Sequence, residues 1–301
     1  MNAKTWLQLI VLSVLWGGTF IFVKEALPAL PPLTLTLARC AIAALVLLPA
    51  VLALGYRPPP PGQWRDFAVM ALLNNVIPFG VIFWGQTMIP SGLAAVANAT
   101  TPLMALLVAR FLAGEALSRN KLIGVLLGVL GVAVLVGPSA LAGDRSSALG
   151  VGLVMIGTFS YGLSGLWGRR FKASPPIVSS LAQLSAATLM LIPIAGVADH
   201  FWTLPMPPPN VILAVLALGI LSTALAYILF FRIMAEAGSN NVMLVTLLIP
   251  VSAITAGTLH FGERLSVNHF VGAAIIALSL LVIDGRLFGP SRPAPVARAG
   301  K

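Results

Sequence analysis

The stretch TPLMALLVARFLAGEALS (residues 101–118) recurs without a gap as IPVSAITAGTLHFGERLS (residues 249–266). Both copies carry a proline at the second position, and Gly-Glu followed two residues later by Leu-Ser. Weaker matches extend the doubling, since LWGGTF (15–20) aligns with SYGLSG (160–165) and LLPA (47–50) with LIPI (191–194). The sequence therefore predicts a duplicated chain with a first half at 1–143, a second at 144–288 and a basic tail at 289–301.

The composition indicates an integral membrane protein. The chain is 58% hydrophobic and 9% charged with a mean hydropathy of +0.99, which is too much apolar surface for one water-facing globule of 301 residues. Its net charge of +10 comes from basic residues in short breaks between apolar runs, so it predicts membrane orientation and not nucleic-acid binding. The N-terminal run lacks a small-residue cleavage site, and we expect it to be retained as the first span. Cys40 is the only cysteine, which excludes an internal disulfide.

Ten apolar segments are long enough to cross a bilayer of about 30 Å. Fourteen basic residues fall on one side of these segments and three on the other, which predicts cytoplasmic N- and C-termini. Proline-rich breaks such as LPALPP and LPMPPPN separate several of them. The expected spans are 5–24, 33–54, 66–87, 91–113, 119–137, 149–169, 175–197, 210–231, 239–261 and 267–285.

Five crossings in each half force the second half to enter the membrane upside down. The sequence therefore predicts an all-α fold of two five-helix inverted repeats around a central cavity. In such folds the binding site lies near the midplane, and rocking of the halves exposes it to each side in turn.

The motifs WGGTF with Lys24, PPLTLTLAR, the stretch 101–118 and the glycine-spaced GVLLGVLGVAVLVG resemble the EamA family of the drug/metabolite transporter superfamily. LLIPVSAITAGTLHFGERLS repeats the pattern in the second half. The resemblance covers nearly the whole chain up to about residue 289. It implies a ten-helix inner-membrane exporter or permease of small metabolites, often amino acids, including aromatic ones.

Polar and aromatic residues within the spans are the candidates for the substrate site. Amides and hydroxyls in lipid need partners, so these residues should face the interior of the bundle, where they either bind substrate or join helices. Trp16 and Tyr161 occupy repeat-related positions, which favours a place beside the central site. The candidates are Trp16, Thr19, Asn74, Asn75, Trp84, Gln86, Asn98, Thr100, Thr101, Tyr161, Ser164, Gln183, Thr223, Tyr227 and Thr246.

Arg39 lies about six residues inside its span, deeper than any other Lys or Arg of the sequence. A guanidinium matches a carboxylate, so Arg39 could attract a substrate carboxylate. The alternatives are a side chain that reaches the interface or one paired with Glu25. Its repeat partner, Gln183, carries no charge.

Three prolines and two glutamates are candidates for gating. Pro78, Pro102 and Pro250 each remove a backbone donor and should kink their spans, either as hinges or as static bends. Glu115 and Glu263 precede Leu-Ser sequences that read as helix starts. They would therefore stabilise the following helix through its dipole or form ion pairs across the halves.

The sequence predicts a carrier and not an enzyme. It holds no GxxxxGK[ST] phosphate loop, no metal-ligand cluster and no sign of a cofactor or an obligate protein partner. Acids lie at helix ends or in loops, which favours uniport or exchange over proton coupling, although Glu115, Glu263 and His260 remain candidate relays. We expect export of small amphipathic metabolites, with amino acids first. A proton-coupled drug carrier, a nucleotide-sugar antiporter, a channel and a membrane enzyme are the alternatives.

Overall fold

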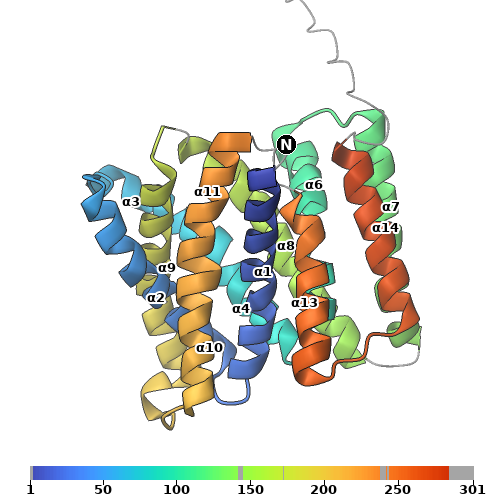
Figure 1. Ribbon diagram of the computed structural model, residues 1–301. Helices are drawn as coiled ribbons and strands as arrows, with labels where there is room; N and C mark the ends of the chain where they lie inside the picture. Colours follow the sequence, from blue (N-terminus) through green and yellow to red (C-terminus); the bar gives the residue numbers. More distant parts are fainter. Residues whose placement is uncertain (1–2, 142–144, 172, 238–241, 243, 285–301) are drawn as a thin grey trace, which may run out of the picture.

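The computed structural model describes residues 3–141, 145–171, 173–237, 242 and 244–284, and the helices of this part form one bundle without strands (Figure 1). The basic tail predicted at 289–301 lies outside the described residues. Seven segments are long and apolar enough to cross a membrane, and α13 and the apolar part of α14 are shorter. The α-helices are α1 (Ala3–Ala26), α2 (Pro32–Ala53), α3 (Trp64–Ala71), α4 (Ile77–Gln86), α5 (Ser91–Asn98), α6 (Thr101–Ala113), α7 (Arg119–Leu141), α8 (Arg145–Trp167), α9 (Pro176–Asp199), α10 (Pro209–Gly219), α11 (Ala226–Ala237), α13 (Val245–Phe261) and α14 (Val267–Asp284).

Proline and glycine set the ends of several helices. α2, α9 and α10 begin at prolines, where the missing backbone N–H has no helical partner to lose. α6 and α13 end at Gly114 and Gly262, whose φ angles of 68° and 65° lie in the left-handed region that glycine adopts without strain. The glycine of the doubled Gly-Glu motif is therefore a helix C-cap in both copies.

Two spans contain a single π-helical turn. The turn η2 (Leu72–Val76) joins α3 to α4, and η5 (Ile220–Leu225) joins α10 to α11. Pro78 lies just after η2 and cannot donate to the carbonyl four residues earlier, which gives η2 a local cause. No proline lies in or beside η5. The two turns begin at positions separated by the same offset as the doubled stretch.

Helix packing joins the two sequence halves throughout the bundle. α7 packs most extensively against α14, and α2 packs against α9, at opposite edges of the view in Figure 1. α1 packs on α13, and α6 packs on α8. Glycines allow these close approaches, because a Cβ added at Gly17 would lie 2.0 Å from Ser252 Oγ and one at Gly162 would lie 3.0 Å from the carbonyl oxygen of Met104.

Candidate functional site

Arg39 lies inside the bundle between α2, α4 and η5, with its charge almost fully removed from solvent. The side chain on α2 is 5% exposed, and its Nε donates to Thr223 Oγ1 of η5 at 2.8 Å. The guanidinium carbon lies 3.8 Å from the ring centroid of Phe79 on α4, a cation–π contact. Glu25 is bound elsewhere, so neither a pair with Glu25 nor an interfacial position describes Arg39.

Asn74 connects three helices beside Arg39. Its Nδ2 donates to Gln183 Oε1 of α9 at 3.0 Å, and its Oδ1 accepts from Ser164 Oγ of α8 at 2.9 Å. The π-turn presents Asn74 and Asn75 together, and Ser160 donates to the carbonyl oxygen of Leu73 within the same turn at 2.7 Å. Three of the predicted residues, Asn74, Ser164 and Gln183, therefore form one hydrogen-bonded chain.

Asn75 is completely buried, and its amide atoms have no hydrogen-bond partner within 3.5 Å, although the Tyr227 phenol lies beside the amide as a weaker polar contact. The Tyr227 phenol of α11 lies beside Asn74 and Asn75, and the phenols of Tyr227 and Tyr161 are both near Arg39. The Tyr161 ring meets Phe79 edge-on with the centroids 6.5 Å apart. We call the resulting group the central cluster: Arg39, Asn74, Asn75, Phe79, Tyr161, Ser164, Gln183, Thr223 and Tyr227.

Several predicted residues lie outside the central cluster. Trp84 is 53% exposed on the surface of the bundle. Gln86 Nε2 donates to the carbonyl oxygen of Phe20, so this amide joins α4 to α1. Thr100 and Thr101 donate to carbonyls within three residues of themselves, and Asn98 Oδ1 is buried without a partner. Thr19 is buried on α1, Trp16 packs on Phe230 with ring centroids 5.3 Å apart, and Thr246 lines an apolar cavity.

Phe79 and the π-turn η5 were not predicted from the sequence. Phe79 follows Pro78 in an apolar run and carries no polar signal. One sequence signal could have indicated η5: Ser222 and Thr223 align with Asn74 and Asn75 at the offset of the repeat.

The three prolines have different local effects. Pro78 and Pro102 lie in the first turns of α4 and α6, and the fourth span is broken into α5 and α6 just before Pro102. Pro250 lies inside the continuous helix α13. Pro102 and Pro250 therefore share a place in the repeat but not a local structure.

Glu263 binds the N-terminus of a helix from the other sequence half. Its carboxylate accepts from Ser91 N at 2.9 Å, Ser91 Oγ at 2.7 Å and Gly92 N at 3.3 Å, at the start of α5. This is not the following helix, α14, as one sequence alternative expected. Asp199, at the end of α9, accepts in the same way from Thr34 N and Oγ1 at the start of α2.

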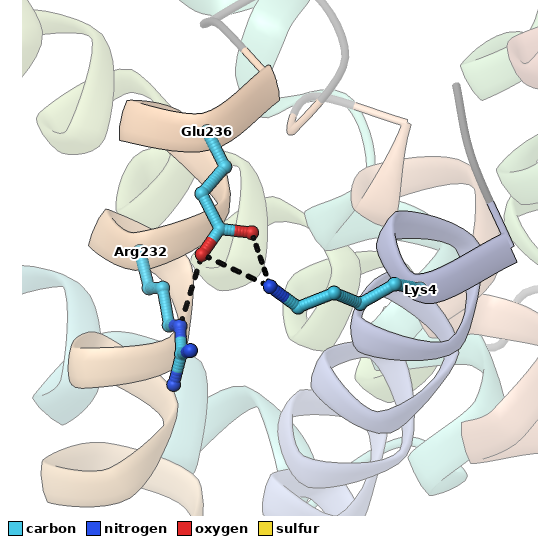
Figure 2. A network of polar contacts seen from close by, with 3 residues as sticks. All are labelled: Lys4, Arg232 and Glu236. Carbon is cyan, nitrogen blue, oxygen red and sulfur yellow. Dashed lines mark hydrogen bonds and ion pairs between the residues drawn. The ribbon is translucent and has the colours of Figure 1, made fainter.

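Exposed ion pairs connect the halves near the N-terminus. Glu115 pairs with Arg169 Nη1 at 2.6 Å, and both side chains are close to half exposed. Figure 2 shows Glu236 on α11 between Lys4 on α1, at 3.3 Å, and Arg232, at 3.1 Å. Exposed pairs of this kind contribute little to stability.

A helical bundle with several membrane-length segments and a buried polar cluster defines a multi-pass membrane protein. No group of three or more His, Cys, Asp or Glu residues that could hold a metal occurs in the described part of the chain. The chain belongs to the EamA-like transporter family, whose model matches twice, at residues 4–137 and 148–284. Membership points to transport and not catalysis.

Curated relatives cover nearly the full length of the chain. The uncharacterized inner membrane transporter YedA of Escherichia coli K12 is 26% identical over 295 residues, covering 96% of this chain and 94% of that protein. A probable amino-acid metabolite efflux pump of Escherichia coli K12 is 26% identical, with coverages of 94% and 95%. Another so named in Salmonella typhimurium is 28% identical with the same coverages.

A solved crystal structure has the same fold. It matches with a TM-score of 0.64 and 22% sequence identity, covering 94% of this chain and 98% of that one. At this identity the likeness shows the fold alone.

Proposed function

We propose that the protein is a secondary transporter that exports small amphipathic metabolites, with amino acids as the substrate class, across the inner membrane. The observation that carries the proposal is the central cluster, in which one cation, several amides and hydroxyls and two phenols meet around Arg39. A carboxylate, an amino group and an apolar side chain would each find a chemical partner there. Two relatives are named as probable amino-acid metabolite efflux pumps, which supports the same class.

The proposal includes ten crossings arranged as two inverted repeats, at 1–143 and 144–288. The two matches to the family model support the duplication. The contacts of Gly17 with Ser252 and of Gly162 with Met104 also support it, because Gly17 aligns with Gly162 and Met104 with Ser252. Counting α7 with the seven long segments and the two shorter ones gives the ten crossings.

Paired contacts inside the central cluster support a site on the axis between the halves. Arg39 on α2 contacts η5, while its repeat partner Gln183 on α9 contacts η2. Each π-turn thus receives a polar side chain from the repeat-related helix of the other half. A pseudo-symmetric site of this kind suits alternating access, in which the same groups are reached from either face.

The proposed orientation has both termini in the cytoplasm, because basic residues gather on that side. The end opposite the N-terminus would then face outward. Glu263 at α5 and Asp199 at α2 would hold this end together between the halves.

Counterflow in proteoliposomes tests the function. Vesicles containing the purified protein would be loaded with one amino acid at a time and diluted into a labelled trace of the same compound, with and without a pH gradient. Saturable exchange of at least one amino acid is expected. Failure of exchange across the whole panel would contradict the amino-acid class.

A further inference from the structure

Arg39 carries a buried charge with no counter-ion in the described part of the chain. It takes part in none of the ion pairs there, and its one described hydrogen bond goes to the neutral hydroxyl of Thr223. Five described carboxylates have partners elsewhere. Glu25 contacts Asn210, Glu115 contacts Arg169, Asp199 contacts Thr34, Glu236 contacts Lys4, and Glu263 contacts Ser91. Asp66 lies in the first turn of α3.

A guanidinium in this position is costly. Removing an ion from water costs several kcal/mol even after the protein relaxes, unless an opposite charge and hydrogen bonds offset the loss. The Phe79 face and the Thr223 hydroxyl supply part of this compensation. A neutral set of partners leaves the net charge of the cluster at +1, because no acid is among its members.

Asn75 provides a second, independent sign of a missing ligand. The side chain is fully buried, yet neither amide atom has a hydrogen-bond partner within 3.5 Å, and the neighbouring Tyr227 phenol supplies only a weaker contact. Buried amides are nearly always satisfied, since an unpaired one costs free energy comparable to a lost hydrogen bond. Asn75 precedes Pro78 in the same turn as Asn74 and lies beside Tyr227, so its unused groups belong to the central cluster.

We propose that Arg39 is the anion subsite of the central cluster, that it binds the carboxylate of the substrate, and that Asn75 supplies a second polar contact. This inference rests on the proposed transport function. A guanidinium presents paired N–H donors that match the two oxygens of a carboxylate. The ligand is then recognised first by its anionic group, and its amino group is secondary.

The same charge makes the protein an exchanger. When the halves rock through a state closed to both faces, the empty cluster passes with the Arg39 guanidinium unpaired, whereas the loaded cluster passes with this guanidinium paired to the substrate carboxylate. A loaded carrier therefore reorients faster than an empty one. We expect exchange to exceed net efflux by more than ~10-fold, since a barrier difference of ~1.4 kcal/mol already gives that factor.

Three compounds that share the same aromatic side chain test the carboxylate and the amino group separately. Phenylalanine has both the carboxylate and the amine, 3-phenylpropanoate has the carboxylate alone, and 2-phenylethylamine has the amine alone. Binding to the purified protein is measured as a concentration-dependent rise in unfolding temperature, and transport as counterflow in proteoliposomes. Phenylalanine and 3-phenylpropanoate are expected to bind and compete, and 2-phenylethylamine to do neither.

Two variants of Arg39 and one matched control complete the experiment. Arg39→Gln gives α2 the residue that occupies the related place on α9, and Arg39→Lys keeps the charge without the planar fork. We expect Arg39→Gln to weaken 3-phenylpropanoate binding ~10- to 100-fold, the scale of lost charge-assisted hydrogen bonds, with a smaller loss for Arg39→Lys. Arg110→Gln removes the same group from an exposed position on α6 and should leave the affinity unchanged.

The outcomes distinguish this inference from the proposed function. Equal binding of the amine and the carboxylate, or an unchanged preference in Arg39→Gln and Arg39→Lys, would overturn the anion subsite even if amino acids are exchanged. Lack of binding by any carboxylate would overturn it as well. Binding of 3-phenylpropanoate without exchange of any amino acid would support the anion subsite and contradict the amino-acid class. Net efflux as fast as exchange would overturn the inference that the loaded carrier reorients faster than the empty one.

Discussion

The carboxylate of Glu263 accepts three hydrogen bonds from Ser91 and Gly92, although the two contacting segments are more than half the chain apart. The contact joins the connection between α13 and α14 to the first turn of α5. An anion at a helix N-terminus satisfies free N–H groups and meets the positive end of the helix dipole. The repeat partner, Glu115, lies instead in an exposed pair with Arg169.

Replacing Glu263 should weaken one end of the bundle. Glu263→Ala is expected to lower the free energy of unfolding by about 2 kcal/mol, because charge-assisted hydrogen bonds to buried donors are lost. Glu115→Ala is the matched control, with an expected loss of at most about 1 kcal/mol for an exposed pair. Thermal unfolding in detergent measures both. Equal losses would show that the α5 contact contributes no more than a surface ion pair.

Gly257 should be required for the same contact. A Cβ at this position would lie 2.6 Å from both Glu263 Oε2 and Ser91 Oγ, so Gly257→Ala should displace the carboxylate while Glu263 is still present. Gly152→Ala, on α8, adds a methyl group where no atom lies within 4 Å and serves as the control. We expect reduced counterflow and a lower unfolding temperature in the first variant only. Normal behaviour of Gly257→Ala would mean that the contact adjusts without cost.

Two repeat-related glycines should both be intolerant of alanine. A Cβ at Gly17 would collide with Ser252, and one at Gly162 would meet the backbone of Met104. Overpacking of this kind typically costs about 1–3 kcal/mol. Gly165→Ala, in open space on α8, should be neutral. The unfolding temperatures of the three variants test this, and a tolerated Gly162→Ala would argue against equivalent packing of the two halves.

Substitution of Asn74 and of Asn75 by leucine should have different effects on the stability of the protein. Asn74→Leu leaves Gln183 Oε1 without its described donor and Ser164 Oγ without one of its partners, so a loss of about 1–3 kcal/mol in unfolding free energy is expected. Asn75→Leu removes an amide that has no hydrogen-bond partner within 3.5 Å and only a weak contact with Tyr227, so stability should be kept or increased while transport falls. Unfolding and counterflow are measured on the same preparations. Retained transport in a stable Asn75→Leu protein would exclude Asn75 from the ligand contact.

Several helix boundaries followed from the sequence because they depend on local properties, and the described residues contain seven membrane-length segments and two shorter apolar helices. Apolar length, proline at helix starts and glycine at helix ends lie within a few residues of the boundaries they determine, as at Pro32, Pro176 and Gly262. Arg39 is distinguished by an equally simple property, since it lies deeper within an expected span than any other Lys or Arg. The doubled stretch also aligns Met104 with Ser252.

The partners of these residues could only come from the tertiary structure. Arg39 meets Thr223 and Phe79, Asn74 meets Gln183, and Glu263 meets Ser91, each pair being brought together by helix packing. The hydrophobic pattern of a sequence does not specify such partners, because any buried amide or hydroxyl could have joined neighbouring helices. Local sequence pattern specifies a duplicated chain of apolar helices with one cation, Arg39, well inside a span. Helix packing, which brings together residues far apart in the sequence, sets which polar groups surround that cation and which of them, such as Asn75, have no hydrogen-bond partner within 3.5 Å.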